Sequence, residues 1–138
     1  MAEATQRRTA AARPLSPHLQ IYSPKINMVM SIVHRITGAA LYVGTLLLAW
    51  WLIAAATGPA YYAFVSQIMG HPIGLAILAG YTWALIHHAL GGVRHFVWDL
   101  GYGFNLVTVD TMCWLSLFAS LGGTAAIWYV VLGARGII

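Results

Sequence analysis

Charged side chains are scarce in this sequence of 138 residues. They make up 7% of the chain, hydrophobic residues make up 60%, and the mean hydropathy is +0.76. A water-soluble domain of this size needs a far more charged surface, so the composition excludes one. We therefore expect lipid to be the solvent for most of the chain.

Several common signatures of function are also missing. The single cysteine, Cys113, forms neither an internal disulfide nor a metal site alone. The sequence contains no internal repeat, no glycine-rich phosphate loop and no nucleophile elbow. The formal net charge of +4 does not indicate nucleic acid, because the basic residues lie mostly at the N-terminus and at expected helix ends.

Three long apolar runs are present. They cover about residues 28–56, 72–98 and 107–132, and each exceeds the roughly 20 residues that cross a hydrocarbon core. The sequence therefore predicts an all-α membrane protein, with a three-helix transmembrane domain over residues 28–132. Residues 133–138 are expected to form a short C-terminal tail.

The segments outside the spans predict the orientation. Residues 1–27 form a basic arm interrupted by prolines, and residues 57–71 are expected to form a short loop with Tyr61 and Tyr62 at the membrane interface. The arm is basic, whereas this loop has no Lys or Arg, so the N-terminus is expected on the cytoplasmic side. We expect a bacterial inner membrane, with the mitochondrial inner membrane as the alternative.

One polar cluster lies near the start of the first span. Ser31, His34 and Arg35 are spaced i, i+3 and i+4, with Gly38 one turn further on. Such a face can hydrogen-bond and neutralise an acidic or carbonyl-bearing ligand. The alternative is that Arg35 extends to the nearby interface and His34 binds a lipid headgroup.

A second polar cluster lies late in the second span. Helical spacing places four of its members on one face: His88, Gly92, His95 and Asp99. Histidine is an ordinary axial ligand of haem iron, and a glycine one turn away lets a flat cofactor approach the backbone. The alternative for His88 is a hydrogen bond to a neighbouring helix, and for the glycine it is close helix packing.

His87 belongs to another face of the same helix. It lies about 100° from His88 and shares the side of Gly91 and Arg94. One helix thus offers one well-placed axial ligand, and a six-coordinate haem needs a second from elsewhere. This arrangement points to a partner subunit.

Three segments, in this order, resemble a known family: residues 13–22, residues 31–38, and residues 88–99 with the pattern H-x3-G-x-R-H-x3-D. The family is the larger cytochrome b membrane-anchor subunit, of the cytochrome b556 type, of succinate dehydrogenase, or complex II. The resemblance covers about residues 13–132. It implies packing with a second, smaller three-helix anchor subunit.

The resemblance implies a role in electron transfer from succinate to ubiquinone. The chain would share haem b with the smaller anchor subunit, help to form the ubiquinone-reduction site and attach the flavoprotein and iron–sulfur subunits to the membrane. FAD and the iron–sulfur clusters would belong to those soluble subunits. No complete active site is then expected in this chain alone.

The resemblance also implies residue roles. Ser31 and Arg35 would line the ubiquinone pocket, His34 and Arg35 would approach the haem propionates, and His88 would be the axial ligand of the haem iron. Three further residues would support the propionate and quinone region or dock the iron–sulfur subunit: Arg94, His95 and Asp99. Three histidines have no predicted role: His18, His71 and His87.

The sequence leaves two competing functions open. In a small transporter or channel subunit, Arg35, Arg94 and the histidines would line a proton or anion path. Three spans are few for a transporter without oligomerisation. A purely structural anchor predicts no haem and no loss of quinone reduction when Ser31 or Arg35 is changed.

Overall fold

The structure, a computed structural model, describes residues 22–137 and contains four helices and no strand within them. Three helices are long and apolar enough to cross a membrane: α2 (Ile26–Thr57), α4 (Pro72–Asp99) and α5 (Leu106–Ala134). Their ends lie within two residues of the predicted spans. The predicted all-α fold with three apolar spans is confirmed.

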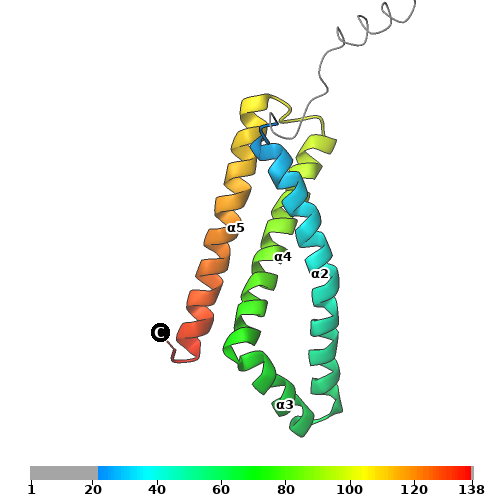
Figure 1. The fold of residues 1–138 in the computed structure, drawn as a ribbon, viewed down its shortest axis with the longest axis vertical. Helices are drawn as coiled ribbons and strands as arrows, with labels where there is room; N and C mark the ends of the chain where they lie inside the picture. Colours follow the sequence, from blue (N-terminus) through cyan, green and yellow to red (C-terminus); the bar gives the residue numbers. More distant parts are fainter. Residues whose placement is uncertain (1–21, 138) are drawn as a thin grey trace, which may run out of the picture.

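Helix α4 lies between α2 and α5 and packs against both (Figure 1). The start of α2, the end of α4 and the start of α5 meet at one end of the bundle. The fourth helix, α3 (Pro59–Gly70), joins α2 to α4 at the other end, which we call the α3 end. The two ends therefore present different residues to the two membrane surfaces.

The prediction of a short loop over residues 57–71 is wrong, because most of this segment forms α3. Gly58 adopts a φ of 143° and ends α2, and Pro59 then occupies the first turn of α3, where its missing N–H costs nothing. The next eleven residues contain no further proline. The Tyr61 hydroxyl accepts a hydrogen bond from Nε1 of Trp50 (2.9 Å), which joins α3 to α2.

Polar side chains cap the starts of α4 and α5. His71 precedes α4, and its Nδ1 accepts a hydrogen bond from the Ile73 N–H (3.4 Å), which gives this histidine a local structural role. Asn105 precedes α5, and its Oδ1 accepts from the Val107 N–H (3.0 Å). Both caps satisfy helix N–H groups that have no partner inside the helix.

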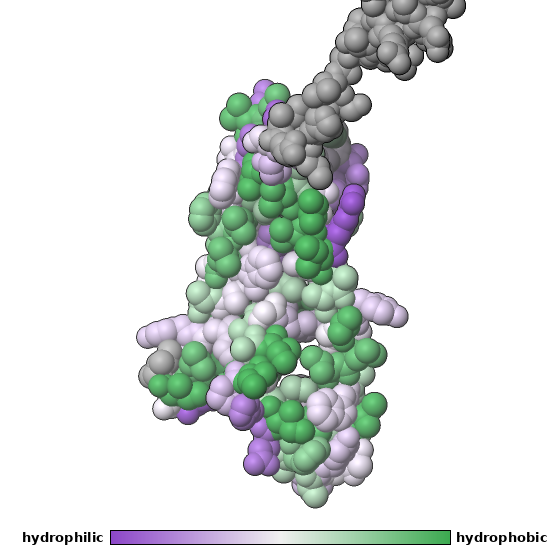
Figure 2. Space-filling view, in the orientation of Figure 1, coloured by the Kyte–Doolittle hydropathy of each residue, from purple (hydrophilic) through white to green (hydrophobic). Residues whose placement is uncertain are grey.

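Small residues allow the helices to approach closely, and few large side chains are buried. A Cβ atom at Gly44 on α2 would overlap the Tyr81 ring on α4. Most large apolar side chains of the spans face outward, and the visible surface of the bundle is largely apolar (Figure 2). This distribution is typical of membrane helices, which pack through small residues and expose apolar ones to lipid.

The predicted basic arm falls mainly outside the described residues. Residues 1–21, including His18 and nearly all of the 13–22 segment, are not described. Residues 22–25 precede the first described helix, and the last two residues of the predicted arm already belong to α2.

Candidate functional site

The two histidines singled out in the two clusters meet between α2 and α4. The rings of His34 and His88 are stacked, with their centroids 4.0 Å apart and an angle of 2° between their planes. Both side chains are half-buried. The structure thus brings the first and second polar clusters together at the α2–α4 contact.

The hydrogen bonds of His88 determine which side of its ring stays available. Its Nδ1 lies 3.1 Å from the backbone carbonyl oxygen of His34 and 3.4 Å from Oγ1 of Thr37. The Thr37 hydroxyl donates to that same carbonyl (2.9 Å), so its proton is already engaged. Because a carbonyl can only accept, we assign the proton to Nδ1 of His88, which leaves the Nε2 lone pair free.

This arrangement suits a metal ligand. Histidines that bind metals usually donate their other ring N–H to a carbonyl or carboxylate, which fixes both the tautomer and the orientation of the ring. The expected alternative for His88, a hydrogen bond to a neighbouring helix, is also present. Both fit the same geometry, because the bond uses Nδ1 and ligation would use Nε2.

His34 has a free ring atom of its own. Its Nδ1 is buried and has no hydrogen-bond partner among the described residues. Buried polar atoms are nearly always paired, so an unpaired one indicates a missing partner such as a ligand group. This atom faces Gly91 of α4, since a Cβ atom added there would overlap it.

Two glycines make room for the histidine pair. A Cβ atom at Gly38 would lie 2.9 Å from Cε1 of His88, and a Cβ atom at Gly91 would overlap the His34 ring. Gly92, which the sequence suggested as the point of cofactor approach, faces open space in this chain. The close approach needed by the histidine pair therefore depends on Gly38 and Gly91.

His95 extends the histidine pair toward the end of α4. Its ring centroid lies 5.5 Å from that of His34, and it packs edge-on against Trp98 at 5.2 Å. Asp99, the last residue of α4, is exposed. Of the four residues predicted on one face of α4, His88 and His95 approach α2, whereas Asp99 stands at the helix end.

Ser31 and Arg35 lie on the outer side of α2. Both are exposed, whereas His34 turns toward α4. The three residues are neighbours on the helix, but this chain supplies only one wall around Ser31 and Arg35. Any pocket that they line must be completed by another molecule.

A neighbouring face of α4, about 100° around the helix from His88, carries a second polar layer that faces α5. His87 is 1% exposed, and its Nδ1 lies 3.1 Å from Oγ of Ser120. Arg94 is 4% exposed and donates from Nη1 to Sγ of Cys113 (3.4 Å). His87 and Arg94 thus face α5 as the spacing suggested, whereas Gly91, which was predicted on the same face, packs against His34 of α2.

Arg94 lacks an anionic partner within the described part of the chain. Its guanidinium carbon lies 5.3 Å from the centroid of the Trp98 ring, and its Nε is buried without a hydrogen-bond partner. A buried positive charge at membrane depth is costly unless it is paired. Arg94 extends from α4 toward Cys113 of α5.

The sequence interpretation overlooked three side chains of these layers: Thr37, Cys113 and Ser120. Thr37 could have been found, since it stands one turn after His34 on a helix already assigned to the site. Cys113 and Ser120 could also have been found, because with Ser116 and Thr124 they form a stripe of small residues at helical spacing on α5, which is typical of a packed membrane-helix face.

The fold and the histidine pair define a class: a membrane protein of three apolar helices with a candidate ligand-binding histidine inside the bundle. A family model described as succinate dehydrogenase/fumarate reductase transmembrane subunit matches residues 9–132, and the chain belongs to this family.

Named relatives agree with this membership. The chain is 46% identical over 94 residues to the succinate dehydrogenase cytochrome b556 subunit of Paracoccus denitrificans, and the aligned residues make up 68% of this chain and 72% of that protein. It is 38% identical over 117 residues to the cytochrome b556 subunit of Rickettsia prowazekii (84% and 90% covered). It is 33% identical over 134 residues to the mitochondrial cytochrome b560 subunit of Mus musculus (96% and 73% covered).

The predicted resemblance is therefore confirmed. Family membership places the chain in the succinate dehydrogenase complex as a cytochrome b membrane subunit, which makes it part of an oxidoreductase.

Proposed function

We propose that this chain holds haem b through His88 and takes part in electron transfer from succinate to ubiquinone. The observation that carries the proposal is the hydrogen bond of His88 Nδ1 to the His34 carbonyl, which leaves Nε2 free to bind iron. The second axial histidine would come from the smaller anchor subunit, since the other buried histidine of α4, His87, faces α5.

The surroundings of His88 suit the haem group. The exposed guanidinium of Arg35 is available to neutralise and hydrogen-bond the propionates, and His34, the preceding residue on α2, would approach them as well. When bound, haem b would supply a centre that is reversibly reduced by one electron close to the quinone. The protein's part is to orient His88, to hold the propionates and to exclude water.

The ubiquinone site would use Ser31 and Arg35. The Ser31 hydroxyl can donate to a quinone carbonyl oxygen, and the Arg35 guanidinium provides positive charge where negative charge develops during reduction. Because both side chains are exposed on the outer side of α2, the remaining walls would come from the partner subunits. The proposal thus requires an assembled complex and not this chain alone.

The end of the bundle near the start of α2 would face the soluble subunits. His95 and Asp99 lie at this end of α4 and would support the propionate region or dock the iron–sulfur subunit, and Arg94 would provide a buried positive charge nearby. Succinate would be oxidised at FAD in the flavoprotein. We place this end on the cytoplasmic side of a bacterial inner membrane, in agreement with the basic N-terminal arm.

A difference spectrum tests the proposal directly. The complex is purified in detergent through a tag on this chain, oxidised, and then reduced with succinate or with dithionite. Sharp b-type bands and co-purification of flavoprotein and iron–sulfur subunits are expected. A colourless preparation without soluble partners would contradict the proposal and favour a proton or anion path through the histidines.

A further inference from the structure

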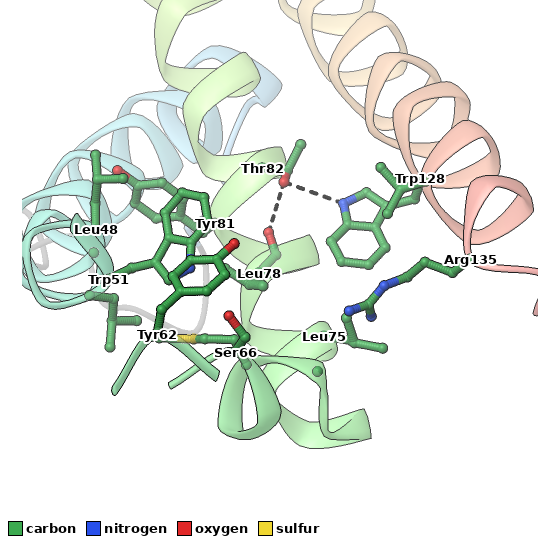
Figure 3. Close-up of a pocket in the computed structure, with 15 residues that line it drawn as sticks. Leu48, Trp51, Tyr62, Ser66, Leu75, Leu78, Tyr81, Thr82, Trp128 and Arg135 are labelled. Atoms are coloured by element: carbon green, nitrogen blue, oxygen red, sulfur yellow. Dashed lines mark hydrogen bonds between the residues drawn. The ribbon is translucent and has the colours of Figure 1, made fainter. Parts of the chain in front are cut away.

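A cavity of about 520 Å³ lies at the α3 end of the bundle, away from the His34–His88 pair. All four described helices contribute to its walls (Figure 3). This volume lies within the range of pockets that hold small organic ligands, about 300–1,000 Å³. The walls are mainly apolar and aromatic, with Trp51, Leu78 and Trp128 among them. The cavity therefore fits a ligand with a hydrocarbon part.

One charged side chain, Arg135, lines this cavity. Figure 3 shows its guanidinium extending from the end of α5 toward Leu75 and α3. A Cβ atom at Gly70 would lie 3.4 Å from Nη2 of Arg135, so the guanidinium stands beside the last residue of α3. The carboxyl end of a helix carries a partial negative charge that helps to hold the guanidinium there.

No full negative charge of this chain lies near Arg135 in the described structure. Residues 36–93 and 111–134, which form the α3 end and most of the spans, contain no Asp, Glu, Lys or Arg. An arginine presents a planar set of donors that matches phosphate oxygens. Charge complementarity therefore favours an anionic ligand over an uncharged one.

One part of the cavity lies at the ends of the spans, beside Gly70 and Arg135, and another part lies beside Gly44 and Tyr81, nearer the middle of the spans. The ends of α2 and α5 lie apart here, and α3 connects the end of α2 to the start of α4 (Figure 1). Trp51, Tyr62 and Trp128 also line the cavity, and such aromatic side chains are enriched where spans reach the membrane interface. A molecule with its charge at Arg135 could extend its chains toward the bilayer centre.

A further polar atom in the cavity lacks a partner. Oγ of Ser66 is buried without a hydrogen bond, whereas Oγ1 of Thr82 already accepts from Nε1 of Trp128 (3.3 Å). Ser66 thus leaves a donor available to an oxygen of the ligand. The site combines one cation, one free hydroxyl and apolar walls.

We propose that this cavity binds one anionic phospholipid, with the phosphate at Arg135 and an acyl chain between α2, α4 and α5. An uncharged isoprenoid quinone would fill the apolar part but leave the guanidinium without an anion. The proposal is independent of the haem and quinone assignments.

Native mass spectrometry of the purified complex can test this site. After lipid removal, the complex receives phosphatidylglycerol and phosphatidylcholine with identical acyl chains in equal amounts. The unmodified complex should retain phosphatidylglycerol in preference to phosphatidylcholine. Arg135→Gln should lower this preference about tenfold, because charge-assisted hydrogen bonds are lost. Lys25→Gln, which removes a positive charge at the opposite end of α2, is the matched control and should change nothing.

A variant that fills the cavity provides a second test. Leu78→Trp should abolish retention of the bound phosphatidylglycerol while the visible spectrum stays as in the unmodified complex. Val131→Trp adds the same bulk from α5 and replaces Leu78→Trp if that variant does not assemble. Equal retention of the two lipids by the unmodified complex, or unchanged preference in Arg135→Gln, would overturn the proposal. So would co-purified quinone that phosphatidylglycerol does not displace.

Discussion

The rings of His34 on α2 and His88 on α4 lie parallel, with their centroids 4.0 Å apart, and the backbone carbonyl of His34 accepts a hydrogen bond from Nδ1 of His88. A single residue of α2 therefore both covers and orients the histidine that we assign to haem. Because one of these contacts is made by backbone, substitution of the His34 side chain removes the stacking but leaves the hydrogen bond in place. The position of α2 relative to α4 thus controls the direction of the free Nε2 atom.

The first prediction distinguishes the two adjacent histidines of α4. His88→Leu should abolish the b-type absorbance, because it removes the nitrogen that is free for iron. His87→Leu should retain the absorbance, since His87 faces α5 and its partner Ser120 keeps a hydrogen bond to the Leu117 carbonyl (2.8 Å). Reduced-minus-oxidised spectra, normalised to the amount of purified complex, measure the effect. Equal loss of haem in both variants would show that the face assignment is wrong.

The second prediction concerns the glycine that admits His34. Gly91→Ala should lower haem content and thermal stability, because the new methyl group overlaps the His34 ring and overpacking typically costs about 1–3 kcal/mol. Gly80→Ala on the same helix is the control, since its Cβ atom would meet nothing within 4 Å. Spectra and a thermal unfolding curve of the purified complex compare the two. If both variants behave like the unmodified complex, the space beside Gly91 does not limit the position of His34.

Helical periodicity explains why the faces of α4 could be predicted from the sequence. His87 and His88 differ by the rotation that the backbone imposes on any two adjacent helical residues, so their separation needed no knowledge of tertiary structure. The span lengths were predictable for a similar reason, because bilayer thickness fixes how many apolar residues are needed.

Contacts that depend on how neighbouring helices rotate were not predictable. Gly91, and not Gly92, lies against His34, and only the relative rotation of α2 and α4 decides between these adjacent positions. The contact of Arg94 with Cys113 likewise depends on the rotation of α5; the stripe of small residues on α5 indicates its packed face but not which residue of α4 each one meets. Helix α3 was missed because Gly58 and Pro59 end the first span and the two tyrosines that follow suggested an interfacial loop, although Pro59 stands at a position where a helix accepts it.

The third prediction separates quinone reduction from succinate oxidation. Arg35→Ala should lower ubiquinone reduction by at least tenfold, since a charge-assisted interaction with the reacting oxygen is lost, and Ser31→Ala should lower it less. Both variants should keep succinate oxidation with an artificial dye that accepts electrons from the soluble subunits. Parallel steady-state assays with quinone and dye, on the same preparation, measure the ratio. A purely structural anchor predicts that this ratio stays constant in both variants.

The fourth prediction uses the buried charge of Arg94. Its guanidinium is 4% exposed, has a sulfur as its hydrogen-bond acceptor and has no carboxylate partner within the described residues. Arg94 follows His88 by six positions, a rise of about 9 Å along the helix. A unit positive charge at a separation of this order from a bound haem would favour the reduced state by about 1–2 kcal/mol at an effective dielectric constant of about 20.

Arg94→Met should therefore lower the midpoint potential of the haem by tens of millivolts, because it removes a positive charge that favours the reduced iron. Methionine has a similar length, so the space between α4 and α5 stays filled. Cys113→Ala is the matched control: it removes the acceptor of the Arg94 Nη1 bond but keeps the charge, and the potential should stay close to that of the unmodified complex. Potentiometric titration of the haem absorbance measures all three proteins. An unchanged potential in Arg94→Met, or an equal decrease in Cys113→Ala, would mean that the charge of Arg94 does not act on the haem. The role of Arg94 would then be confined to the contact between α4 and α5.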